Sequence, residues 1–493
     1  MAPGRYRRRT VAAAAFGLLG GTALGGGATV HAAEWRFTPV IEVTEAYNSN
    51  IDLTARGAEK SDFITDVSPG IGVRGSGRQL TVNADYNPEF LFFADHSGRD
   101  EVHQRFNGFA NAELVQQRLF LDVSGSAARH EVGQTLPAGQ NELTANNNLR
   151  RVTVADISPS YRHHLGGYAD AEVRYRHDRV TADTPEVADT QTNEISLAAI
   201  SGEEFATLKW QLSGRQSHTD RDGAVGGAAN ADIRRRLGKA DFEYGLFSGL
   251  AVVAGVGHEA IKDATLRQPI DGVIWDAGFV YRPSRATSFR ASQGERFERP
   301  NTSVALTHAF TPRTTLNASY VENVRTSQDV LLEQLGRIGV DENARLIDGA
   351  SQLPFAIRDS AFGLINEAFR QEVYRVSLDM TRGRSTYRLE AFRDTREFDV
   401  ATGSVTSTGG SVGFSRRLTR WLHGSLSADY RHSRFDIPRG RTDDSYTVRG
   451  ALRYQVSETL EASLSAEHSD RENSATDFET AQSLVAIRLA KKF

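Results

Sequence analysis

The residues that could do chemistry in this chain are few, and their spacing does not favour catalysis. Residues 409–413 spell Gly-x-Ser-x-Gly around Ser411, the pattern of a serine nucleophile that needs a histidine base within hydrogen-bond reach. The motif runs into Phe414 and an alternating stretch, not into the helix that a nucleophile elbow requires. We interpret it as the start of a glycine-rich strand.

The sequence gives equally little support for metal or thiol chemistry. The chain contains no cysteine, and its 13 histidines include no His-Glu-x-x-His motif or other ligand spacing. His163-His164, His177-Asp178 and His130-Glu131 fall where strands are expected to end or turn, which favours solvated side chains. We predict no catalytic residue, no metal site and no cofactor, and therefore a protein that is not an enzyme.

The dominant pattern of the sequence is a period of two. Val485, Ile487 and Leu489 are apolar, whereas the residues between them are polar or small, up to the final Phe493. The same alternation recurs over residues 169–176, 208–215, 387–391, 446–456 and 460–467. One apolar and one polar face predict strands between lipid and a wet interior, and a terminal aromatic residue suits the membrane interface. A soluble β-sandwich would also alternate and is the competing interpretation.

Connection lengths favour the membrane interpretation. Tight joins at 75–78, 115–118, 164–167, 247–249, 282–285, 311–313, 382–384, 418–420 and 457–459 lie between mostly longer polar links such as 48–61, 131–148 and 220–230. Short turns on one side and long loops on the other are typical of bacterial outer-membrane barrels. We predict an all-β, transmembrane antiparallel outer-membrane β-barrel of about 22 strands, give or take two to four, with one long, partly helical insertion. An even strand number places both termini in the periplasm.

The N-terminal stretch is interpreted as a cleaved secretory signal peptide over residues 1–32, followed by a single barrel domain over residues 33–493. Arg5, Arg7, Arg8 and Arg9 precede an apolar stretch and a small-residue cleavage site at Ala32. A retained membrane anchor is the alternative. The formal net charge of −4, with both signs interspersed, excludes an electrostatic footprint for nucleic acid.

One segment, residues 327–369, breaks the alternation. Leu331, Leu332, Leu335 and Ile338 recur at helical spacing after Ser327, which we expect to cap the helix. By strand parity the segment is an extracellular connection, much longer than ordinary loops. It either folds over the rim of the barrel or inserts into the lumen as a constriction.

The polar faces of the strands carry charges of both signs. By alternation the candidate lumen-lining residues are Glu172, Arg174, Arg176, Lys209, Arg215, Arg388, Arg449 and Arg453. They predict a hydrated, charged channel. The polarity alone indicates no selectivity, because any water-filled lumen must be polar. Positive and negative charges are both present, so the sequence leaves the charge of a transported polymer open.

The start of the mature chain carries a family resemblance. Trp35, Pro39, Glu45, Tyr47, Asn50, Pro69 and Gly70 resemble the opening block of the outer-membrane proteins associated with PEP-CTERM and exopolysaccharide systems, which are grouped with the β-barrel porins type 2. The rest of the chain resembles the family only in strand rhythm and in the terminal assembly signal Phe493. Lys491 departs from the aromatic or apolar residue that is usual two positions before the terminal Phe.

The resemblance implies an outer-membrane protein of a Gram-negative cell that serves exopolysaccharide secretion. Its expected partners are outer-membrane lipid and lipopolysaccharide, the barrel-assembly machinery, exopolysaccharide and periplasmic export proteins. A general diffusion porin and a structural surface barrel are the alternatives from other functional classes, and a barrel hydrolase is a further one.

Overall fold

The structure, a computed structural model, describes most of the chain after the predicted signal peptide. The described residues are 34–131, 143–144, 149–185, 187–222, 232–263, 265–266, 268–297, 299–340, 346–348, 364, 367–398, 403–436, 440–474 and 478–493. The signal peptide predicted over residues 1–32 lies outside them.

Twenty-two of the strands form one antiparallel sheet. They are β1 (Glu34–Asn48), β2 (Asp62–Ser76), β3 (Leu80–Phe93), β4 (Glu101–Val115), β5 (Leu119–Glu131), β6 (Leu149–His164), β7 (Ala169–Ala182), β8 (Asp189–Ser201), β9 (Leu208–Asp222), β10 (Ile233–Phe247), β11 (Leu250–Lys262), β12 (Ile270–Ser284), β13 (Thr287–Arg296), β14 (Arg299–Thr311), β15 (Thr314–Arg325), β18 (Phe369–Arg382), β19 (Ser385–Phe398), β20 (Gly403–Arg417), β21 (Leu422–Phe435), β22 (Arg441–Gln455), β23 (Leu460–Asn473) and β24 (Phe478–Lys492). Smaller elements are the 3-10 turn η1 (Ser97–Arg99), the helix α1 (Ser327–Leu335) and a hairpin of β16 (Ile338–Val340) and β17 (Leu346–Asp348).

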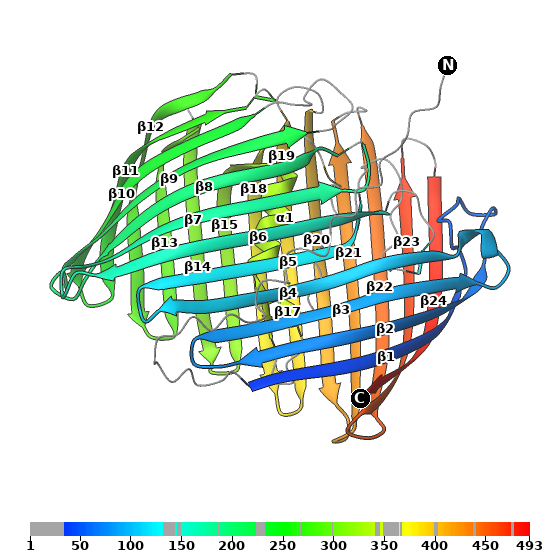
Figure 1. Cartoon of the computed structure of the whole chain (residues 1–493). Coiled ribbons are helices and arrows are strands. Elements are labelled where there is room, and N and C mark those ends of the chain that lie inside the picture. The colour runs from blue at the N-terminus through cyan, green and yellow to red at the C-terminus, as the bar shows by residue number, and fades with distance from the viewer. Residues whose placement is uncertain are drawn as a thin grey trace, which may run out of the picture.

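The sheet closes into a barrel because its first and last strands pair (Figure 1). β1 and β24 are antiparallel from Val40 opposite Lys492 to Asn48 opposite Leu484. The backbone N–H of Phe493 then donates to the carbonyl of Pro39 at 2.9 Å. The predicted barrel of 22 strands is thereby confirmed, and closure removes the exposed sheet edges that would otherwise invite aggregation.

The links between strands alternate in length, as the sequence predicts. One end of the barrel carries short links such as 77–79, 116–118, 248–249 and 383–384, together with both ends of the described chain. The other end, called the long-link end below, carries links such as 49–61, 132–148 and 326–368. One link at that end, 297–298 between β13 and β14, is only two residues long. Among the described residues, no helix is long and apolar enough to span a membrane.

The two faces of the wall differ as the alternation predicts. Val173 and Tyr175 of β7, and Val448 and Leu452 of β22, are exposed on the outer face. Buried apolar side chains gather instead at the long-link end, where links fold against inward-facing residues; one such cluster joins Ile51, Ile64, Leu91 and Phe93. The wall is thus apolar towards lipid, and its interior is packed mainly near one mouth.

Candidate functional site

All eight candidate lumen-lining residues lie on the inner face of the wall. Glu172, Arg174 and Arg176 alternate with the exposed Val173 and Tyr175 on β7. Lys209 and Arg215 lie on β9, Arg388 on β19, and Arg449 and Arg453 on β22, each with the parity opposite to that of exposed apolar neighbours. Their contribution to a conduction path stays a prediction.

Most of these cations are paired with carboxylates on neighbouring strands. Arg215 lies 3.3 Å from Glu194, Arg388 lies 2.7 Å from Asp379, and Arg453 lies 3.1 Å from Glu461. Because such pairs are half-exposed and screened by water, we expect each to add little to stability. Their main effect is to fix the positions of charges along the inner wall.

A recurring arrangement holds one cation between two carboxylates. Arg174 contacts Asp122 at 2.8 Å and Glu172 at 2.9 Å. Arg449 contacts Asp429 at 3.1 Å and Glu467 at 2.6 Å. Arg176 likewise contacts Asp156 at 2.7 Å and Asp178 at 3.3 Å.

Sequence reasoning missed two further cations of this kind. Lys239 lies 2.7 Å from Asp241 and 2.6 Å from Asp276. Arg488 of β24 lies 3.3 Å from Glu42 of β1, across the seam that closes the barrel, and 3.7 Å from Glu461 of the neighbouring β23. The i, i+2 spacing of Lys239 and Asp241 was a usable signal. Arg488 offered none for its nearer partner, because the contact with Glu42 is fixed only by closure.

Replacing Arg174, Arg388 and Arg449 together by glutamine is expected to make the pore prefer cations more strongly. Each substitution removes a positive charge and leaves its carboxylates uncompensated in a confined, water-filled space. The reversal potential of reconstituted protein in a salt gradient measures the change. The same substitution of the outward-facing Arg234, Arg236 and Arg393 is the control. An equal shift in both variants would mean that the inner-face arginines do not line the path.

Helix α1 is organised by a capping box. The side chain of Thr326 accepts a hydrogen bond from the Asp329 N–H at 3.2 Å, and the Asp329 carboxylate accepts one from the Thr326 N–H at 2.8 Å. The expectation that Ser327 caps the helix was therefore wrong: Ser327 is the first helical residue. The box requires a hydrogen-bond-accepting side chain three positions after the cap, and Asp329 stands at that spacing from Thr326, whereas Val330 stands there from Ser327.

The helix lies across the interior near the long-link end. Leu331, Leu332 and Leu335 pack with the inward-facing Val152 and Val154 of β6 and with Val180 of β7. On its other side, Val330 packs against Phe369, Phe398, Val405 and Phe435 of β18 to β21. Nine strands separate β6 from β18 in one direction and eleven in the other, so the helix touches nearly opposite walls.

Charge also anchors the helix. Asp329 lies 3.0 Å from Arg235 of β10. Burial opposes ionisation of Asp329, but the Arg235 charge and the hydrogen bonds from Thr326 prevail and lower the pKa of this carboxyl below its ordinary value. A lowered pKa means that docking favours the charged form, so this contribution is complete above the ordinary pKa and is lost as the pH falls through the lowered one.

Asp329→Asn is expected to loosen the helix, because it removes the charge on Arg235's partner and weakens the capping box, at a cost of about 1–3 kcal/mol. The single-channel conductance should become noisier and higher at neutral pH. In the wild type it should stay constant from neutral pH down to about pH 5, since Asp329 remains ionised there. Glu333→Gln, at an exposed position of the same helix, is the control. Identical traces for Asp329→Asn and Glu333→Gln would contradict a docking role for Asp329.

The family-motif residue Asn50 is a structural residue of the closing seam. Its side chain is fully buried. Its amide nitrogen donates to the carbonyls of Thr54 at 2.9 Å and Ala481 at 3.1 Å. Its amide oxygen accepts from the Thr54 N–H at 3.0 Å and the Thr54 hydroxyl at 3.2 Å. One side chain thereby folds the 49–61 link and ties it to β24.

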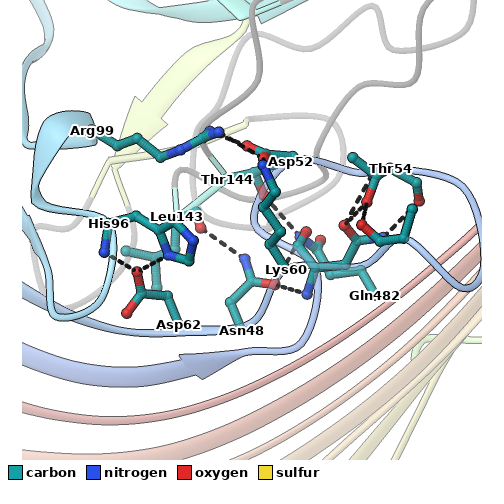
Figure 2. A network of polar contacts seen from close by, with 12 residues as sticks. Asn48, Asp52, Thr54, Lys60, Asp62, His96, Arg99, Leu143, Thr144 and Gln482 are labelled. Atoms are coloured by element: carbon teal, nitrogen blue, oxygen red, sulfur yellow. Dashed lines mark hydrogen bonds and ion pairs between the residues drawn. The ribbon is translucent and has the colours of Figure 1, made fainter.

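Neighbouring polar residues extend this seam network (Figure 2). Gln482 of β24 donates to the side-chain oxygen of Asn48 at 3.1 Å and to the Thr144 hydroxyl at 3.2 Å. Asn48 in turn donates to the Leu143 carbonyl at 2.9 Å. The first strand, the last strand and a piece of the link between β5 and β6 thus meet at one buried polar cluster.

The other motif residues lie along β1 and β2. Trp35 and Tyr47 are exposed on the outer face, where Glu45 accepts a hydrogen bond from Thr65 at 2.7 Å. The carbonyl of Pro39 receives the Phe493 N–H, so the motif meets the terminal assembly signal.

Pro69 and Gly70 of the same motif occupy a break in the β2–β3 ladder. Pairing is interrupted between Val67 opposite Phe90 and Ile71 opposite Tyr86. By this register Pro69 faces Pro88, and neither proline has an N–H to donate.

The residues with catalytic patterns are not assembled into a site in the described part of the chain. Ser411 lies within β20, opposite Glu390 of β19 and Asp429 of β21, so the Gly-x-Ser-x-Gly sequence is barrel wall. His218, Asp220 and Asp232 lie together at the long-link end, with the His218 ring 3.0 Å from Asp220. They are largely solvent-exposed and we assign them no ion.

Comparison with known proteins agrees with this geometry. Residues 382–493 match a family model described as "Putative beta-barrel porin 2". The last part of the chain is similar to a porin. No curated protein matches the sequence.

Solved structures share the barrel at low sequence identity. The FrpB iron transporter from Neisseria meningitidis (F3-3 variant) is 10% identical, with a TM-score of 0.52 over 93% of this chain and 82% of that one. The siderophore receptor PirA from Acinetobacter baumannii is 8% identical, with a TM-score of 0.49 over 93% of this chain and 80% of that one. The FrpB likeness concerns the fold alone. With the porin match and the closed barrel, we conclude that the chain is a porin-like outer-membrane β-barrel.

Proposed function

We propose that this protein is an outer-membrane pore through which a hydrated saccharide polymer leaves the cell. In this proposal the long-link end faces outward and both termini face the periplasm, as in bacterial barrels generally. The polymer assignment rests on the resemblance of the N-terminal block to proteins of exopolysaccharide systems. The porin match to residues 382–493 supports the pore itself.

The observation that carries the proposal is the position of α1. A nine-residue helix packed against nearly opposite inner walls narrows the interior without belonging to the wall. A polymer leaving through the barrel would have to pass this helix or displace it. The helix is therefore proposed as the constriction that keeps a wide barrel from leaking small solutes.

The chemistry of the inner wall suits an uncharged or weakly charged polymer. Its arginines are largely compensated by carboxylates, as around Arg174 and Arg449. Paired charges of both signs bind water and sugar hydroxyls without holding one strongly charged chain. A ladder of uncompensated arginines would instead favour a polyanion.

The decisive experiment compares exopolysaccharide in the medium and in the periplasm of cells lacking this protein. Polymer trapped in the periplasm, and released when the gene is restored, would establish export through this barrel. Unchanged secretion would contradict the proposal. Restoring the gene with residues 329–367 deleted tests the constriction separately from transport. Such a pore should still export polymer, but it should no longer exclude small solutes.

A general diffusion porin is the second candidate, and the porin-model match favours it. It predicts that small neutral sugars enter liposomes containing the wild-type protein at rates that fall steeply with sugar size. Liposome swelling measures this directly. Tight exclusion of every small sugar by the wild type, together with entry through the deletion variant, would contradict the diffusion porin.

A further inference from the structure

The barrel wall is split at the long-link end between β4 and β5. These strands pair only from Phe106 opposite Ala127 towards the short-link end. Beyond that point, residues 101–105 of β4 pair with β3, and residues 128–131 of β5 pair with β6. The two strands therefore diverge over their last residues and leave a notch in the rim, called the β4–β5 notch below.

The notch holds a cavity of about 760 Å³. Residues of both faces of the wall line it, including the consecutive residues Arg150 and Arg151 of β6. In an unbroken wall, successive side chains point to opposite faces. Two successive residues can therefore line the same cavity only where the wall is interrupted.

The lining is predominantly basic. Arg99, Arg129, Arg150 and Arg151 line the cavity, against two acidic residues, Glu101 and Asp183. Four guanidinium groups around one cavity produce a positive potential that attracts anions.

Two of these arginines are held in place by the protein. Arg99 forms a two-pronged ion pair with Asp52, one prong at 2.7 Å, in the seam network (Figure 2). Arg129 donates to the backbone carbonyls of Thr144 at 3.3 Å and Leu149 at 3.5 Å. The basic side of the cavity is thus built into the loops that close the barrel.

The other two arginines remain available to a ligand. Arg151 is 3.4 Å from Asp183, and both side chains are about half or more exposed, at 48% and 70%. The Arg150 guanidinium group forms no ion pair or hydrogen bond with any residue that the structure describes. His103 also lines the cavity. Its side chain is only 10% exposed and its Nε2 contacts Glu101 at 2.7 Å, whereas its Nδ1 has no hydrogen-bond partner among the described residues.

We propose that the β4–β5 notch binds the phosphate groups of a phosphorylated saccharide. Guanidinium groups match phosphate oxygens in charge and in paired hydrogen-bond geometry. The lining residues come from both faces of the wall, so a phosphosugar could reach the notch as the headgroup of an outer-leaflet glycolipid or as part of a soluble saccharide. Binding of a glycolipid headgroup rests on the proposed function, in which the long-link end faces outward. Binding of phosphate by the arginines does not depend on that orientation.

Binding to the full-length mature protein in micelles tests this proposal. The probes are bisphosphorylated lipid A, the same lipid without its phosphates, and glucosamine 1-phosphate as a soluble phosphosugar. Native mass spectrometry measures the bound lipid, and calorimetry measures the soluble sugar. Arg150→Gln/Arg151→Gln is the test variant. Arg234→Gln/Arg236→Gln, at the same end of β10 and on the outer face, is a control with equal charge loss.

We expect the test variant to bind bisphosphorylated lipid A about tenfold more weakly or worse, with the control unchanged. If only the binding of lipid A depends on the two arginines, the ligand is the lipid headgroup. If the binding of glucosamine 1-phosphate depends on them equally, the ligand is the soluble saccharide. Equal binding of phosphorylated and dephosphorylated lipid, or equal losses in test and control, would overturn the proposal. The conductance of the same variants, measured separately, reports on the pore, so failure of one proposal does not imply failure of the other.

Discussion

Replacing residues 329–367 by a short Gly-Ser link is expected to raise the single-channel conductance, because it removes a helix about 10–12 Å across with its side chains, which packs against nearly opposite inner walls. The deletion removes all of α1 after its first two residues, including Leu331 and Leu335, which pack against β6 and β7, and it leaves the 22 barrel strands intact. Conductance of the purified variant in planar bilayers measures the effect. The migration of unboiled protein in gels checks that the barrel has folded.

A second variant removes the docking and keeps the chain length. Leu331→Asp/Leu335→Asp places two carboxylates in an apolar contact that is now fully buried, which costs several kcal/mol and should detach the helix. We expect it to show openings as large as those of the deletion, interrupted by closures. Glu333→Gln controls for changes on the exposed face of the helix, where Glu333 forms an ion pair with Arg325 at the end of β15. Wild-type conductance in both folded variants would exclude the constriction.

Asn50→Ala is expected to lower the free energy of unfolding by about 2–4 kcal/mol, because it leaves the buried Thr54 N–H and Ala481 carbonyl without their partner. The lost bonds connect the 49–61 link to β24, so the seam should open first. Urea unfolding of the protein in lipid vesicles, followed by tryptophan fluorescence, gives the difference.

Asn111→Ala is the matched control for this substitution. Asn111 makes an exposed hydrogen bond to Asp122 at 2.7 Å, near the short-link end of the barrel. Its loss should cost less than about 1 kcal/mol, since water replaces the partner. Equal destabilisation by the two substitutions would mean that the seam network has no special role in closing the barrel.

The resemblance to the exopolysaccharide-associated proteins gains a physical interpretation for two of its positions. Asn50 is buried and organises the closing seam, so a residue of this type can recur for folding and assembly without touching a transported polymer. The same holds for Pro39, whose carbonyl receives the Phe493 N–H. Likeness at these positions therefore supports a common barrel more directly than a common substrate.

The sequence by itself determined the strands and their faces. A period of two is a local property, because successive side chains of a strand point to opposite sides whatever the strand pairs with. Alternation therefore sufficed to place Arg174 and Arg449 on the inner face and to predict 22 strands with links of alternating length. It also located α1, since a helical period is equally local.

Only the tertiary structure decided which residues meet. Arg488 contacts Glu42, 446 positions away, because the barrel closes in one register. The packing of α1 against β6 and β18, and the split between β4 and β5, likewise depend on where links fold back and where pairing ends. Such contacts follow from register and closure, which involve the whole sheet at once, and no local pattern in the sequence encodes them.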